Sequence, residues 1–88
     1  QQPPATVDPP PVAQTVTKTV TVSLEGREGP VNVRLLLDGT EVGSASADAS
    51  LDLEVDVAVQ GTVGMGVKEL AIYINGVASG TARVDFDS

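Results

Sequence analysis

Two apolar segments of this chain each end in a dipeptide that favours the tightest form of β-hairpin. Residues 35–37, Leu-Leu-Leu, are followed by Asp38-Gly39, and residues 72–74, Ile-Tyr-Ile, are followed by Asn75-Gly76. Asp-Gly and Asn-Gly tolerate positive φ at both central positions of a two-residue turn, and the resulting backbone matches the twist of antiparallel strands. The two segments therefore predict two antiparallel hairpins and an all-β fold.

An alternation of apolar and polar residues extends the β pattern to most of the chain after residue 15. Successive side chains of a strand point to opposite faces, so a period of two marks a half-buried strand. Two strands, 16–24 and 51–60, are predicted to turn these apolar residues toward a core: Val16, Val20, Val22, Leu24, Leu51, Leu53, Val55, Val57 and Val59. Lys18 interrupts the first series, which predicts a sheet edge at the beginning of that strand.

Pairing across the first turn predicts which face of the return strand is buried. With a two-residue turn, Leu37 should lie opposite Thr40 and Leu35 opposite Val42. Because Leu35 belongs to the apolar face, this register places Val42 on the core side of a short strand at 41–47.

The second hairpin requires an irregularity. Strict pairing would bury Ser79, Thr81 and Arg83 on the return strand, although the intervening residues are the apolar ones. One extra residue reverses the face of a strand, and glycine is the natural occupant of such a bulge. We therefore expect a β-bulge near Gly80, with three residues facing the core: Ala82, Val84 and Phe86.

The two hairpins can also be superposed at an offset of 37 residues, which places Asp38-Gly39 on Asn75-Gly76 and Gly43 on Gly80. A duplicated hairpin explains this match. The alternative is that any two hairpins of a β-sandwich share the same turn chemistry.

Short strands separated by frequent turn signals, about seven in number, predict a small antiparallel β-sandwich of two packed sheets rather than a barrel. The chain has 88 residues, enough for one domain, which we place at 15–88. Residues 1–14 carry five prolines and are expected to form an extended, Pro-rich arm or linker. Within this arm, candidate contacts to a partner are Pro9, Pro10, Pro11 and Val12.

Composition excludes several classes of function. The chain has no Cys and no His, which removes disulfides, thiolate catalysis, imidazole general-base chemistry and Cys/His metal sites. A net charge of −7 opposes binding to nucleic acid and to anionic membranes. The sequence shows no apolar stretch long enough for a membrane span and no secretory leader. We expect no enzymatic activity and no cofactor.

An oxygen-ligated Ca²⁺ site is the sharpest alternative to a plain acidic surface. Asp52, Glu54 and Asp56 alternate along one strand with successive side chains about 6.6 Å apart, too far for all three to bind one ion. Asp85 and Asp87, or Asp38 and Asp48, could complete the oxygen cage. The competing interpretation is a solvated acidic face.

Two further features concern partners. The glycine-rich segment 61–66 carries Val63 and Met65, which either fold back on the core or form a small contact patch for a partner. The alternate threonines of the first strand, from Thr15 to Thr21, form either a solvated face or a surface for strand addition by a neighbouring subunit.

The order of these motifs resembles a known kind of module. An apolar strand ending in Leu-Leu-Leu-Asp-Gly-Thr-Glu-Val-Gly-Ser, an acidic strand, Ile-Tyr-Ile-Asn-Gly and a terminal Val-Asp-Phe are similar to bacterial and phage immunoglobulin-like modules. The Pro/Thr-rich linker followed by strands with Asp-Gly and Asn-Gly turns also resembles the C-terminal extracytoplasmic domain of RodZ-type cell-shape proteins. The first resemblance implies an immunoglobulin-like β-sandwich and the second implies a β-sandwich, and neither supplies catalytic residues.

Three functions remain open. The favoured one is a structural, adhesive or assembly module of a bacterial surface or virion protein, extracellular or virion-bound, that binds a protein partner or a second copy through its arm and strand edges. A carbohydrate-binding module, Ca²⁺-dependent or not, would need Tyr73 or Phe86 exposed beside acidic residues. A periplasmic regulatory domain of the RodZ type is the third.

Overall fold

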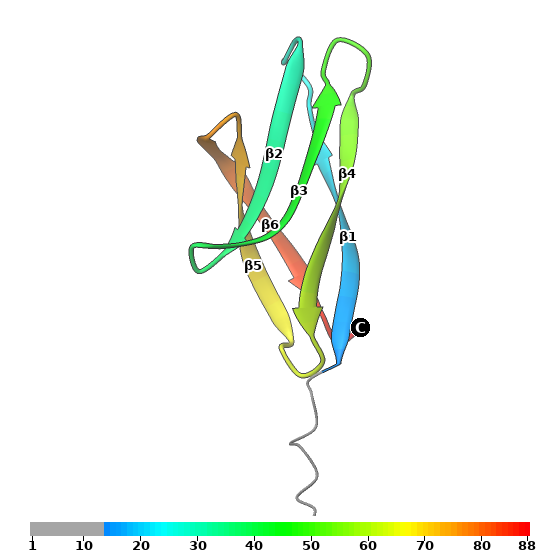
Figure 1. The fold of residues 1–88 in the computed structure, drawn as a ribbon, viewed down its shortest axis with the longest axis vertical. Coiled ribbons are helices and arrows are strands. Elements are labelled where there is room, and N and C mark those ends of the chain that lie inside the picture. Colours follow the sequence, from blue (N-terminus) through cyan, green and yellow to red (C-terminus); the bar gives the residue numbers. More distant parts are fainter. Residues whose placement is uncertain (1–13) are drawn as a thin grey trace, which may run out of the picture.

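The computed structural model describes residues 14–88, and these residues form six antiparallel strands (Figure 1). In chain order the strands are β1 (Thr15–Ser23), β2 (Pro30–Leu37), β3 (Thr40–Asp48), β4 (Glu54–Thr62), β5 (Val67–Ile74) and β6 (Val77–Asp85). No helix in this described part has the length and apolar character needed to span a bilayer. The described residues thus contain six strands rather than the predicted number of about seven.

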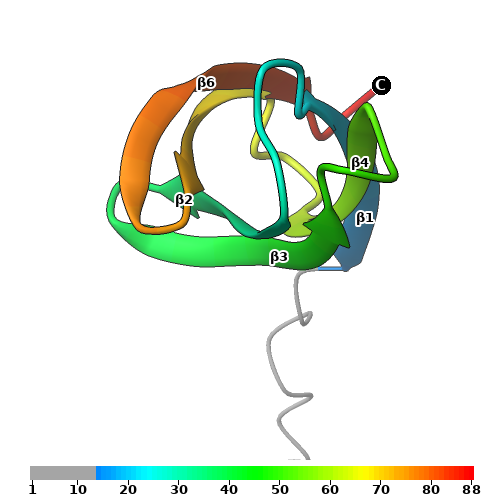
Figure 2. The same cartoon turned by 90° about the horizontal axis from the view of Figure 1, so that it is seen from above.

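The strands form two sheets, which confirms the predicted all-β antiparallel sandwich. One sheet holds β1 and β4, and the other has the order β3-β2-β5-β6. Seen from the end, the two sheets curve around a common interior (Figure 2). The interior is filled by twelve buried apolar side chains from both sheets: Val20, Val22, Leu24, Val31, Val33, Leu35, Val57, Val59, Leu70, Ile74, Val84 and Phe86. Among residues 14–88 no polar side chain is buried. This is expected, because the hydrophobic effect favours burial of apolar side chains and polar ones mostly stay exposed.

The first hairpin differs from the predicted pairing by one residue. Leu37 pairs with Thr40 as expected, but Leu35 pairs with Gly43, because a β-bulge inserts Val42 between the pairs. The predicted pairing of Leu35 with Val42 is therefore wrong. Val42 nevertheless packs against the core, since the bulge turns the extra residue inward.

The second hairpin contains the predicted bulge. Ile72 pairs with Gly80 and Tyr73 with Ala78, so Ser79 is the extra residue beside Gly80. Beyond the bulge the strand presents its apolar face inward, and Val84 and the following Phe86 are buried.

The two hairpins have the same construction at the offset of 37 residues. Both turns have positive φ at the two central residues, 49° and 83° in the first and 51° and 80° in the second. Their bulges also fall at equivalent positions, opposite Leu35 and opposite Ile72. These two residues pair with each other where β2 meets β5. The four-stranded sheet therefore has a local two-fold arrangement centred on this pair.

The prediction for Leu51 and Leu53 is wrong. Both lie in the loop before β4, with 81% and 79% of their surfaces exposed, although they continue the alternation of the strand. The paired part of β1 ends at Ser23, which pairs with Glu54. Leu24 makes one further hydrogen bond to the carbonyl of Leu53, and beyond it the two segments diverge into loops, so no facing sheet covers the two leucines.

The two sheets approach each other closely along β3 and β4. A Cβ atom added to Gly43 of β3 would collide with the carbonyl oxygen of Ala58 and lie 2.8 Å from a methyl group of Val59. Only glycine permits this close approach of two backbones. On the opposite side, β1 and β6 do not pair, and a groove separates them.

Candidate functional site

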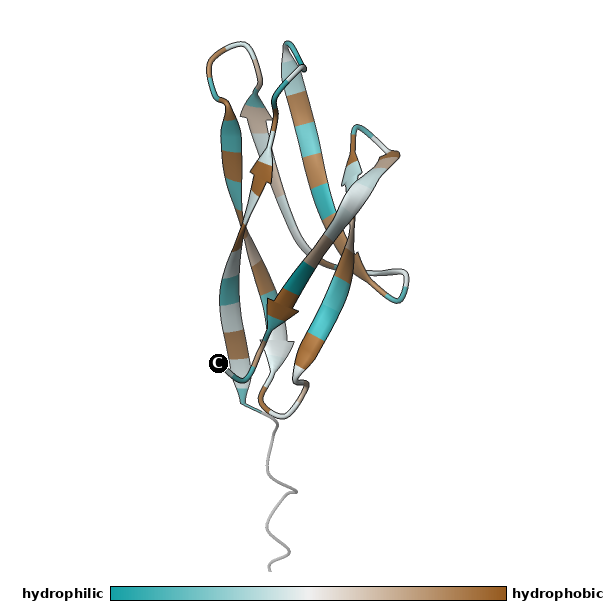
Figure 3. Cartoon of the chain, turned by 180° about the vertical axis from the view of Figure 1, so that it is seen from behind, coloured by the Kyte–Doolittle hydropathy of each residue, from teal (hydrophilic) through white to brown (hydrophobic). Residues whose placement is uncertain are grey.

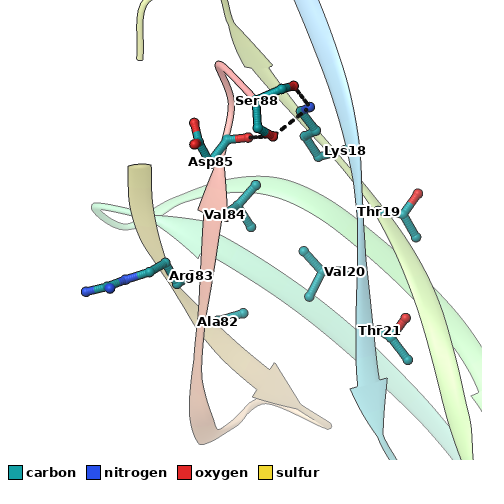
Figure 4. A pocket seen from close by; sticks show the side chains of 9 residues that line it. All are labelled: Lys18, Thr19, Val20, Thr21, Ala82, Arg83, Val84, Asp85 and Ser88. Carbon is teal, nitrogen blue, oxygen red and sulfur yellow. Dashed lines mark hydrogen bonds between the residues drawn. The ribbon is translucent and has the colours of Figure 1, made fainter. Parts of the chain in front are cut away.

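The groove between β1 and β6 is the surface where two strand edges face each other without pairing. Its volume is about 430 Å³. In Figure 4 the side chains of Val20, Ala82 and Val84 point toward one another across it, whereas those of Thr19, Thr21 and Arg83 point away. Val20 and Val84 belong to the core. The groove therefore has an apolar floor and two walls made of backbone.

On β1, hydrogen bonds to β4 show which backbone groups face the groove. Val63 donates its N–H to the carbonyl of Gln14, and Leu24 donates to the carbonyl of Leu53, so even-numbered residues of β1 bond to the β4 side. Backbone groups of alternate residues in a strand point to opposite edges. The N–H and C=O groups of Thr19 and Thr21 are therefore directed into the groove.

The same reasoning applies to β6. Phe86 donates its N–H to the carbonyl of Gly66, which places even-numbered residues on the β5 side. The backbone groups of Thr81 and Arg83 consequently face the groove. Strand edges of this kind are templates for pairing with another extended chain.

A polar clasp closes one end of the groove. The ammonium group of Lys18 donates to the carbonyl oxygen of Ser88 at 2.6 Å and to its hydroxyl at 3.3 Å. The Ser88 hydroxyl in turn donates to the carbonyl of Asp85 at 3.1 Å. The clasp joins the start of β1 to the segment after β6, and Figure 4 shows these contacts.

The carboxylates considered for Ca²⁺ are distributed over separate parts of the fold. Asp52 lies in the β3–β4 loop, and Asp56 lies on β4, where it accepts a hydrogen bond from the Thr21 hydroxyl at 2.7 Å. Asp85 accepts the N–H of Asp87. Within residues 14–88 no group of three or more Asp, Glu, His or Cys residues could hold a metal ion. Glu54 begins β4 and is exposed, as is Asp38 in the first hairpin turn, and Asp48 is half-buried at the end of β3.

Asp87 has a structural role that was not expected from the sequence. Its two carboxylate oxygens accept the N–H groups of Gly64 and Gly66 at 2.7 and 2.9 Å. This pairing fixes the β4–β5 loop against the segment after β6. The loop's two glycines have positive φ, which turns their N–H groups toward one acceptor.

The two apolar residues of this loop have different environments. Met65 packs against the core, and its sulfur accepts the N–H of Thr62 at 3.0 Å. Val63 is 56% exposed. Val63 is thus the more accessible residue of this candidate contact patch, since Met65 is half-buried. The other proposed contacts, Pro9, Pro10, Pro11 and Val12, lie outside the described residues.

The aromatic residues offer little support for sugar stacking. Phe86 is only 2% exposed and belongs to the core, so it has no free face for a ligand. Tyr73 is half-buried on β5. Phe86 therefore cannot form a platform for a sugar, and of the two candidate aromatic residues only Tyr73 has part of its side chain accessible.

The sequence indicated one wall of the groove and missed the other. The threonine alternation and Lys18 predicted a strand edge on β1, and β1 does pair on one side only. Nothing in the sequence of β6 predicted that this strand would form the second wall. Which strand of one sheet lies beside a given strand of the other depends on how the sheets pack and not on the strand's own residues.

Comparisons of the chain with protein-family models, with curated proteins and with solved structures give no significant match.

Proposed function

We propose that the chain is a non-enzymatic structural, adhesive or assembly module that binds an extended segment of a protein, either a partner or a second copy, at the edges of β1 and β6. The observation that carries this proposal is the groove whose two walls present backbone N–H and C=O groups over an apolar floor. Main-chain hydrogen bonds to such an edge supply affinity, and the apolar floor selects side chains at alternate positions.

The resemblance to immunoglobulin-like modules of bacterial surfaces and virions supports placing this protein at a cell surface or in a virion. The chain's hairpins, with Asp-Gly and Asn-Gly turns and bulged return strands, are consistent with that class. Such a module acts by presenting surfaces, so its function depends on the edges that its own sheets leave unpaired.

Proline in place of Thr19 tests the proposal. Thr19 directs its N–H into the groove, so proline removes a donor from the free edge and leaves the β1–β4 hydrogen bonds in place. Thr19→Val keeps the N–H and serves as the control. Sedimentation velocity over a range of concentrations should show association for the wild-type chain and for Thr19→Val, and monomers for Thr19→Pro.

If the wild-type chain stays monomeric, self-association is refuted, and selection from a displayed library of random peptides decides the remaining form of the proposal. Peptides that bind the wild-type chain and Thr19→Val but not Thr19→Pro would support strand addition. Peptides that bind all three equally, or the absence of any enriched peptide, would refute it. Circular dichroism of each variant confirms that it is folded.

A further inference from the structure

The end of the sandwich formed by the β1–β2 and β3–β4 loops carries two leucines that the fold leaves uncovered. Leu51 and Leu53 are 81% and 79% exposed. In Figure 3 hydrophobic colour lies on the β3–β4 loop at the tip of the molecule, and in Figure 1 the chain enters β1 at the opposite end. We call these two loops, residues 24–29 and 49–53, the leucine tip.

Hydrogen bonds within the β3–β4 loop give it a defined shape. Leu51 and Asp52 both donate their N–H groups to the carbonyl of Asp48 at 2.9 Å. The Asp48 carboxylate also accepts the N–H of Ser50 at 2.9 Å. The loop therefore folds around Asp48 at the end of β3.

Further hydrogen bonds join the two loops of the tip. Ala49 donates to the carbonyl of Gly29 and Leu24 to the carbonyl of Leu53, both at 2.8 Å. The Ser50 hydroxyl accepts the N–H of Gly29 at 2.9 Å. An exposed leucine on a mobile loop can fold back at little cost, but these contacts hold the loop so that both side chains face solvent. A binding surface that is already ordered loses little conformational entropy when a partner docks.

The charges around the two leucines define what kind of partner fits. Glu25 and Glu28 lie on the first loop, Asp48, Asp52 and Glu54 lie on or beside the second, and one cation, Arg27, accompanies them. Arg27 directs its guanidinium to the Ser79 hydroxyl at 3.3 Å. The leucines are thus bordered by an excess of negative charge.

We propose that the leucine tip is a docking site for a protein segment that combines large apolar side chains with Lys or Arg. Opposite charges around an apolar contact favour the correct partner and its orientation, and each leucine buried against this segment adds hydrophobic stabilisation. A second leucine tip carries the same negative charge, so two copies of this surface repel each other. An anionic membrane is repelled in the same way.

A library of random peptides displayed on phage supplies the probe. The full chain is the bait, and the double variant Leu51→Ser/Leu53→Ser is used to remove peptides that bind elsewhere, since it keeps every charge. We expect enriched peptides to combine large apolar residues with Lys or Arg. Synthetic copies of these peptides should bind the double variant roughly tenfold or more weakly than the wild-type chain.

Val77 provides a matched control. It is also an exposed apolar residue, at 64%, but lies at the turn of the second hairpin. Val77→Ser should leave peptide binding unchanged, and all three proteins should unfold at similar temperatures because the altered side chains are exposed. NMR shifts on adding the peptide should fall on the amides of residues 24–29 and 49–54.

Four results would overturn the proposal. They are the absence of enriched peptides, equal binding to the double variant, NMR shifts confined to other regions, and enriched peptides without basic residues.

Two further experiments test whether the leucine tip binds something other than such a protein segment. Co-sedimentation with vesicles of phosphatidylcholine and phosphatidylglycerol that requires the leucines would indicate a membrane, and self-association lost in the double variant would indicate a second copy. Thr19→Pro should leave this peptide binding intact, which separates the leucine tip from the β1–β6 groove.

Discussion

Gly43 lies where β3 approaches the backbone of β4, and its missing side chain lets the two sheets meet along one side. We expect Gly43→Ala to reduce the free energy of unfolding by about 1–3 kcal/mol, because the added methyl group collides with the Ala58 carbonyl and with Val59. Urea unfolding followed by circular dichroism measures this loss.

The neighbouring Ser44 supplies the control for that measurement. It is exposed on the same strand, so Ser44→Ala should change the free energy of unfolding by less than about 0.5 kcal/mol. Equal effects of the two substitutions would mean that β3 and β4 do not meet closely at Gly43. A change in the denaturant slope would instead indicate an altered denatured state.

At the scale of elements, the two hairpins are a natural comparison, since they share turn type and bulge position but differ in the contacts of the first turn residue. Asn75 accepts the N–H of Asn32 through its side-chain oxygen at 2.9 Å and donates its own N–H to the Asn32 carbonyl. Asp38, the equivalent residue, has a similar positive φ. The interaction made by Asn75 ties the second turn to β2.

We therefore predict that Asn75→Ala is more destabilising than Asp38→Ala. Both substitutions force alanine into positive φ, at a cost of about 1–2 kcal/mol. Asn75→Ala also removes the hydrogen bond to Asn32, which adds about 1 kcal/mol. Thermal and urea unfolding of the two variants give the difference. A larger loss in Asp38→Ala would contradict the structure at the second turn.

At the scale of the whole molecule, the acidic charge opposes compactness. The net charge is −7, and the described residues contain one salt bridge, between exposed Arg34 and Glu41. Added salt weakens the repulsion among the surface carboxylates. It also weakens the Arg34–Glu41 ion pair, but a single exposed pair contributes little stability. Raising NaCl from low to moderate concentration should stabilise the chain by about 1 kcal/mol, or roughly 4–8 °C in the unfolding midpoint.

Choline chloride at the same ionic strength should have the same effect, because screening does not depend on which cation is used. A fall in the unfolding midpoint with either salt would show that attractive charge pairs outweigh repulsion in this protein.

Local sequence patterns were sufficient to predict most of the fold, but not the residues at which the pairing between strands ends. The turn dipeptides and the bulge beside Gly80 follow from backbone chemistry, and the structure contains both. Leu51 and Leu53 were misassigned because alternation continues past the last pair of β1 with β4, and no residue in the loop signals that end. The β1–β6 groove was not predicted for a related reason, since it depends on the packing of two sheets.

The pairing of the first strand with the fourth affects how this protein can fold. Residues 23 and 54 meet at one end of that ladder and residues 15 and 62 at the other, so a long stretch of chain must be closed into a loop before any bond of the ladder forms. Domains dominated by such distant pairings fold in milliseconds to seconds. On a ribosome adding about 5–20 residues per second, the first strand, which carries Val16, Val20 and Val22, is synthesised seconds before its partner exists. During that interval its apolar face is open to chaperones and to other nascent chains.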